Sequence, residues 1–129
     1  MRKKRKKRSK LKILKDKAWK LFSLYIRKKE LGICFTCGKQ GDIKDMQAGH
    51  FKHRKLDFDE RNIHCQCKRC NSKFMLRGNL DVYAVKLEEA YGYGILQDLT
   101  IAARPAHKYS QQELEDIIDK YSYKLQEFE

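Results

Sequence analysis

The chain has 129 residues, of which 36% are charged and 41% hydrophobic, and its net charge is +13. This length favours one domain with a modest core, and the apolar residues are too interrupted for a membrane-spanning helix. The charged start is not followed by the apolar stretch of a secretory leader, so we expect a cytoplasmic protein that has no membrane partner.

The positive charge is concentrated at the N-terminus. Residues 1–31 contain 15 Lys and Arg but 2 Asp and Glu, so the rest of the chain is balanced. Residues 1–9 are predicted to be a disordered basic arm, because like charges repel and nothing there can be buried. A basic arm on a neutral body favours a polyanion partner, above all nucleic acid, although a merely solvated tail is the alternative. The arm residues expected to contact it are Arg2, Lys3, Lys4, Arg5, Lys6, Lys7 and Arg8.

A long helix is predicted after the arm, over residues 10–31. Ser9 can cap its start, and Gly32 can end it. Apolar residues spaced by three or four form a stripe that should face the core; they are Leu11, Leu14, Ala18, Leu21, Phe22 and Tyr25.

Four of the five cysteines form two C-x2-C pairs, Cys34 with Cys37 and Cys67 with Cys70. Two such pairs can hold one tetrahedral Zn²⁺. In a reducing compartment this pattern indicates metal binding rather than disulfides. Cys65 belongs to neither pair and is expected to serve as a core thiol rather than as a metal ligand.

The segment 32–78 is predicted to form a ββα unit with zinc at its base. Residues 46–51 and 62–66 have the character of two short strands, and residues 52–60 form a charged loop between them. A short helix should run from Cys70 to about Leu76.

The segment 79–129 is predicted to be helical. Three helices are expected, over about residues 80–91, 95–103 and 111–127, and Asn79 should cap the first of them. The last helix begins with the capping-box pattern of Ser110 and Glu113. Residues 10–129 are therefore expected to form a single domain of the α+β class that is mostly helical.

The centre of the chain offers the parts needed for phosphodiester hydrolysis. His50 can act as general base, Asn71 can offer an amide oxygen to Mg²⁺ or Mn²⁺, and Asn62 can hold the loop between the strands and so orient His50. The ββα order should bring these three positions to one face. Basic residues nearby can hold phosphates; they are Lys52, Arg54, Lys55, Lys68, Arg69 and Lys73.

This stretch resembles the HNH, or ββα-metal, endonucleases in their zinc-bound form. More narrowly, Q-A-G-H-F, F-D-E-R-N-I-H-C-Q-C-K-R-C-N and the later G-N resemble the phage NinG, or Rap, recombination proteins, over about residues 33–94. The resemblance implies an HNH-like core and a structure-specific DNA endonuclease that acts on branched recombination intermediates such as Holliday junctions. It also implies that His50 is the base, Asn62 the supporting asparagine and Asn71 the cation ligand.

Gly49 departs from the family pattern, because many HNH nucleases have Asp or His before the base as a second cation ligand. We expect Asp59 to supply it, with Asp57, His53, His64 or water as alternatives. The departure leaves two other functions open: a non-catalytic zinc module that binds DNA in recombination, and an HNH nickase of duplex DNA. Symmetric junction cleavage would favour a homodimer.

Overall fold

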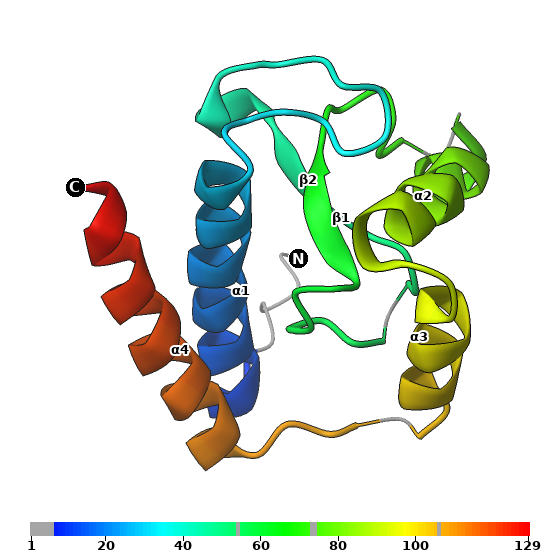
Figure 1. The fold of residues 1–129 in the computed structure, drawn as a ribbon. Helices are drawn as coiled ribbons and strands as arrows, with labels where there is room; N and C mark the ends of the chain where they lie inside the picture. The colour runs from blue at the N-terminus through cyan, green and yellow to red at the C-terminus, as the bar shows by residue number, and fades with distance from the viewer. Residues whose placement is uncertain (1–6, 54, 73–74, 106) are drawn as a thin grey trace, which may run out of the picture.

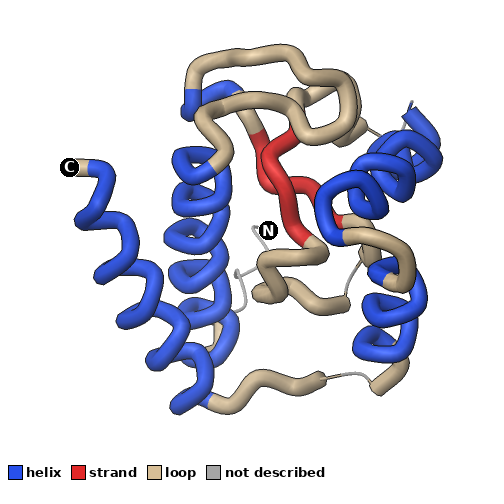
Figure 2. The backbone as a smooth tube through the Cα atoms, in the orientation of Figure 1, coloured by secondary structure: helices blue, strands red, loops and turns tan. Residues whose placement is uncertain are grey.

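The computed structural model describes residues 7–53, 55–72, 75–105 and 107–129. The fold is a mostly helical α+β arrangement with a two-stranded hairpin and a long N-terminal helix (Figure 1). Figure 2 shows the same chain by element type, with the hairpin lying between helices on either side. Among the described residues, no helix is long and apolar enough to cross a membrane.

Helix α1 (Lys10–Lys29) confirms the first predicted helix. Ser9 caps it, since its Oγ accepts a hydrogen bond of 3.2 Å from the backbone N–H of Lys12. The chain then leaves the helix through Leu31 and Gly32, both at positive φ. A side chain on Gly32 would collide with the carbonyl of Gly41, so this exit needs a glycine.

Strands β1 (Gln47–His50) and β2 (Ile63–Gln66) pair in antiparallel fashion, with His50 opposite Ile63 and Gln47 opposite Gln66. Both predicted strands are present, although each is shorter than the predicted range. Every residue of β2 is buried, because the hairpin is covered on both faces.

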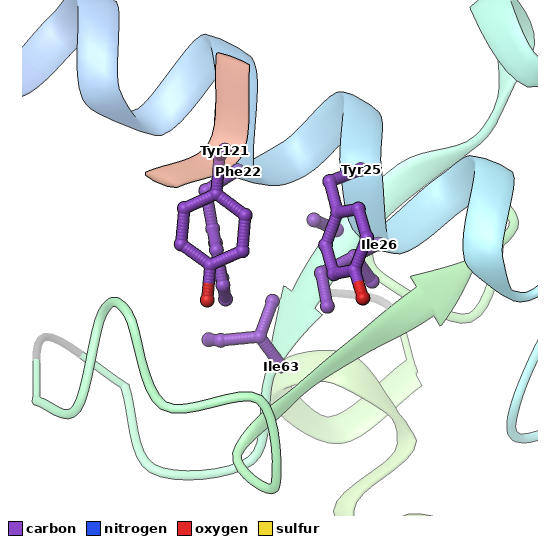
Figure 3. Packing of buried hydrophobic residues seen from close by; sticks show 6 residues of the cluster. Phe22, Tyr25, Ile26, Ile63 and Tyr121 are labelled. Atoms are coloured by element: carbon purple, nitrogen blue, oxygen red, sulfur yellow. The ribbon is translucent and has the colours of Figure 1, made fainter. Parts of the chain in front are cut away.

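Helix α1 lies between the hairpin and α4 (Gln111–Leu125), and the main core fills this space. Figure 3 shows Phe22, Tyr25 and Ile26 of α1 meeting Ile63 of β2 and Tyr121 of α4. The rings of Phe22 and Tyr121 meet edge to face, 4.9 Å between centroids. This packing fixes α1 against one face of the hairpin.

Helices α2 (Leu76–Tyr91) and α3 (Ile95–Ala103) lie on the other side of the hairpin. The predicted start of α2 was wrong: Asn79 lies inside this helix, and its amide donates to Cys70 Sγ at 3.7 Å instead of capping. The predicted helix start at Cys70 was also wrong, since Cys70 and Asn71 lie in a turn. This turn is closed by a hydrogen bond of 3.0 Å from the backbone N–H of Asn71 to the carbonyl of Cys67, but it does not continue as a helix.

Helix α4 begins with the predicted capping box. Ser110 Oγ accepts from the N–H of Glu113 at 3.1 Å, and the Glu113 carboxylate accepts from the N–H of Ser110 at 3.2 Å. The helix ends at Leu125 and continues as a short 3₁₀ helix (Gln126–Phe128).

Candidate functional site

The four paired cysteines form one cluster. The sulfur atoms of Cys34, Cys37, Cys67 and Cys70 all lie within 4.8 Å of one another. In each pair the backbone N–H of the second cysteine lies 3.5 Å from the sulfur of the first. This donor set is that of a structural Zn²⁺ site, as the sequence predicts. Cys65 lies outside the cluster and is fully buried, and burial raises the pKa of its thiol to about 12.

The thiols of the cluster compete for a shared negative charge. Burial opposes ionisation of Cys34, but hydrogen bonds from Thr36 and from backbone N–H groups lower its pKa to about 6. Burial and the neighbouring thiols raise the pKa of Cys37 to about 12. A divalent cation removes this competition, because it stabilises all four thiolates together.

His50 is the last residue of β1, and its ring is held between two elements. Trp19 of α1 stacks on it, with 5.0 Å between centroids and an interplanar angle of 19°. On the ring edge, His50 Nε2 lies 3.0 Å from Asp57 Oδ1, and the other oxygen of Asp57 lies 3.0 Å from Lys15 Nζ. The hydrogen bond from His50 lowers the pKa of Asp57, with a further contribution from Lys15 that opposes the effect of burial. His50 is therefore oriented by an ionised carboxylate.

Asn62 is fully buried and holds the loop that follows His50. Its Oδ1 accepts from the N–H of Lys52 at 2.7 Å. Its Nδ2 lies 3.1–3.3 Å from the carbonyls of Lys52, Lys55 and Leu56. The loop contact expected of Asn62 is thus present, whereas its part in catalysis stays a prediction.

Asn71 lies beside Gly49, the residue before His50. A Cβ on Gly49 would overlap Gln66 Oε1 and would lie 2.8 Å from Asn71 Oδ1. Successive strand residues point to opposite faces, so Asn71 lies on the α2 face of β1 while the His50 ring lies on the α1 face. His50 and Asn71 were expected to share one face of the hairpin. Instead they lie on opposite faces of β1, next to the last two residues of that strand.

The Gly49 neighbourhood has the donor chemistry of a hard-cation site. Two amide oxygens, from Gln66 and Asn71, surround the space that a Gly49 side chain would fill. Mg²⁺ and Mn²⁺ prefer oxygen ligands of this kind. The residues present therefore fit such a cation.

Asp59, the expected second cation ligand, is engaged elsewhere. Its two oxygens accept from the guanidinium of Arg61, at 3.1 and 2.8 Å, and one also accepts from the backbone N–H of Arg61. The carboxylate beside His50 is that of Asp57. His64 is buried against Glu30, with 2.7 Å between Nδ1 and the carboxylate, so it links β2 to the end of α1.

The predicted phosphate-binding residues are partly described. Lys55, Lys68 and Arg69 are exposed, and Lys52 is half-buried with its ammonium 5.5 Å from the Phe51 ring. Arg8 pairs with Asp16 at 2.9 Å, and both are exposed. Lys7 is exposed as well. The remaining predicted residues lie outside the described part of the chain: Arg2, Lys3, Lys4, Arg5, Lys6, Arg54 and Lys73.

Sequence reasoning missed the roles of Trp19, Lys15 and Gln66. Trp19 and Lys15 lie one turn apart on α1, which is the signal that could have placed both against one target. Gln66 gave a different signal: it is a polar residue that stands between Cys65 and Cys67, at the end of a strand whose residues are all buried.

Comparisons with known proteins identify the family of the chain. The family described as Bacteriophage Lambda NinG protein matches residues 1–129. The chain belongs to the NinG family. Among curated relatives, Protein ninG of Salmonella phage P22 is 32% identical over 108 residues, which cover 80% of this chain and 51% of that protein. Protein ninG of Escherichia phage lambda is 30% identical over the same length, covering 80% and 51%.

This NinG-family chain spans about half the length of the curated relatives that it matches. No solved structure matches it significantly. The sequence matches therefore establish the family of the chain but not the geometry of its site.

Proposed function

We propose that the chain is a metal-dependent HNH-type endonuclease that hydrolyses DNA phosphodiester bonds, with the cysteine cluster as its structural zinc site. One observation carries the proposal: His50 is clamped between Trp19 and Asp57 at the end of β1, one residue from the amide oxygens beside Gly49. A histidine with a purely structural role would not need to be oriented in this way beside oxygen atoms that can bind a cation.

Asp57 selects the reactive nitrogen of His50. An ionised carboxylate can only accept a hydrogen bond, so His50 Nε2 must carry the proton that lies toward Asp57. The other ring nitrogen, Nδ1, is then the one that can take a proton from water. The carboxylate also stabilises the imidazolium that forms, as in other His–Asp pairs.

The remaining residues position the reaction. Asn71 would hold a Mg²⁺ or Mn²⁺ ion, which when bound supplies Lewis-acid stabilisation of the phosphate and the leaving oxygen. Asn62 holds the backbone of Lys52, Lys55 and Leu56 in place through its buried amide. The exposed Lys55, Lys68 and Arg69 can contact flanking phosphates. Asp59 stays a proposed further ligand that would first have to leave Arg61.

We propose branched DNA, such as a Holliday junction in phage recombination, as the substrate. Family membership and the excess of 13 positive charges in the first 31 residues support a polyanion of this kind. Symmetric cutting of a junction would need two sites, so the proposal includes a homodimer. Nicking of linear duplex DNA is the alternative within the same chemistry.

A cleavage panel tests the proposal. The zinc-loaded protein is incubated with a four-way junction, a flap and a linear duplex, in Mg²⁺ or Mn²⁺. We expect junction cleavage that falls at least about 100-fold in His50→Ala, the scale of a lost general base. His107→Ala is the control for the loss of a histidine that is not the proposed base, because His107 is exposed, pairs with Glu113 at the start of α4 and contacts the Tyr109 ring edge to face. Absence of cleavage by wild type, or equal loss in both variants, would contradict the proposal.

A non-catalytic DNA-binding module is the second candidate. It is favoured by Gly49, which replaces the Asp or His ligand that the family pattern often places before the base. It predicts that junction binding survives His50→Ala and Asn71→Ala and that no divalent cation yields products. The same panel, read by both binding and cleavage, separates the two candidates.

A further inference from the structure

Gln66 is the residue of the hairpin that the proposed reaction leaves unexplained. It is fully buried in β2. Its Oε1 is buried and has no hydrogen-bond partner, alone among the buried side-chain nitrogen and oxygen atoms of the described residues. An unsatisfied buried oxygen is destabilising, so its retention calls for a ligand.

The hydrogen bonds of the Gln66 amide nitrogen fix the orientation of the amide group. Nε2 donates to the carbonyl of Gly78 at 2.9 Å and to Thr36 Oγ1 at 3.2 Å. A carbonyl can only accept, so the nitrogen must face Gly78. The oxygen of Gln66 must therefore face Gly49 and Asn71.

The oxygens of Gln66 and Asn71 converge on the strand end from two different elements. Both lie around the position that a Gly49 Cβ would take, and both lie 3.8 Å from the corresponding position at Gly78. The Asn71 amide is oriented by Nδ2, which donates to Gln47 Oε1 at 2.8 Å. His53 Nε2 lies 3.7 Å from the same point at Gly78, so the cluster adjoins the His50–His53 ring pair.

We propose that Gln66 Oε1 and Asn71 Oδ1 are two protein ligands of one divalent cation of the Mg²⁺ and Mn²⁺ class. Gln66 thus takes the place that the family pattern gives to the residue before the base, and Gly49 is small because the Gln66 side chain occupies its space. Both ligands are neutral, so the free protein binds the cation weakly, and DNA phosphates complete the shell. The inference rests on the proposed nuclease function, but cation binding is measured without DNA.

The test is a Mn²⁺ titration of the zinc-loaded protein, followed by the electron paramagnetic resonance signal of free Mn²⁺. The zinc site does not compete, since its thiolates favour Zn²⁺ over Mn²⁺. Gln66→Met removes the oxygen at similar length and should weaken Mn²⁺ binding about tenfold. Asn71→Asp keeps an oxygen at the Oδ1 position and adds a negative charge. It should strengthen Mn²⁺ binding about tenfold, because affinity follows ligand charge. Gln111→Glu is the control, because it adds one negative charge at an exposed position on α4, and it should leave Mn²⁺ binding unchanged.

The opposing result is equally specific. If the Asn71 amide donates to Gln66 Oε1, the two side chains form a hydrogen-bonded pair with no cation. Asn71→Asp would then lower the thermal midpoint without strengthening Mn²⁺ binding, which overturns the proposal. Absence of Mn²⁺ binding by wild type overturns it too. If Gln66→Met loses its fold or its zinc, Asn71→Asp decides alone. Mn²⁺ binding with the expected effects but without DNA cleavage would refute the nuclease function and leave the cation site standing.

Discussion

Replacing Gly49 by alanine should destabilise the protein far more than such a substitution in a strand normally does. The backbone of Gly49 is ordinary strand, so alanine is conformationally allowed there. The added methyl, however, would overlap Gln66 Oε1 and lie 2.7 Å from Gln66 Cδ. The Gln66 side chain must therefore move, and it is fully buried.

The cost follows from what Gln66 gives up. Its two hydrogen bonds, to Gly78 and Thr36, contribute about 1 kcal/mol each. Overpacking adds about 1–3 kcal/mol, and the smaller entropy of the unfolded alanine chain returns about 0.4–1 kcal/mol. Gly49→Ala should thus lower the free energy of unfolding by about 3 kcal/mol.

Urea unfolding at fixed free zinc measures this change. Gly41→Ala is the matched control, because its methyl would meet only the flexible Met46 side chain, with the sulfur at 3.0 Å; we expect a loss below about 1 kcal/mol. In the Gly49→Ala, Gln66→Ala double variant the clash is absent, so the two changes should be coupled by at least about 1 kcal/mol. Equal losses for Gly49→Ala and Gly41→Ala, or additive effects in the double variant, would refute the reasoning.

Two further predictions concern the His50 loop. Asn62→Ala should cost about 2–3 kcal/mol and raise the rate of proteolysis next to Lys52 and Lys55, because the part-buried N–H of Lys52 loses its acceptor; unchanged proteolysis would argue against the loop-holding role. The pKa of Asp57 is lowered in the fold, chiefly by the hydrogen bond from His50, so its stabilisation is present above about pH 4 and is lost as the pH falls through the folded pKa. Asp57→Asn should therefore destabilise the protein by about 1–2 kcal/mol at pH 7, and the difference from wild type should shrink steadily as the pH falls below about 4; a difference that does not shrink as the pH falls would show that the charge of Asp57 is not its cause.

The local features of the chain were readable from the sequence. The Ser9 cap, the capping box of α4, the two strands and the paired cysteines all depend on residues close together in sequence. The predicted stripe of α1 also faces the core, except for Leu11, which is exposed. Periodicity and capping act within a few residues, so these predictions needed no knowledge of the fold. The helix predicted from Cys70 failed because that segment is a turn, and the start of α2 was placed too late because the helix begins at Leu76, before the Gly78-Asn79 pair that marks a break in the sequence pattern.

The site itself was only half determined by sequence. The residue types of His50, Asn62 and Asn71 and their order followed from the motif, as did the absence of a ligand at Gly49. Which carboxylate lies beside His50 was decided by α1, whose Lys15 and Trp19 reach across the hairpin and hold Asp57 and His50 in place. Such contacts join residues more than 30 positions apart, and no local pattern encodes them.

The meaning of Gly49 shows the same division most clearly. By sequence alone, a glycine before the base is a missing ligand. In the tertiary structure, the position that its side chain would take is where the Gln66 and Asn71 oxygens converge. Strand pairing sets Gln66 diagonally across from Gly49, and the cysteine knuckle brings Asn71 to the same point. Only the packing of three separate segments could decide that the space is filled, because the volume around one residue is a property of its neighbours in the fold.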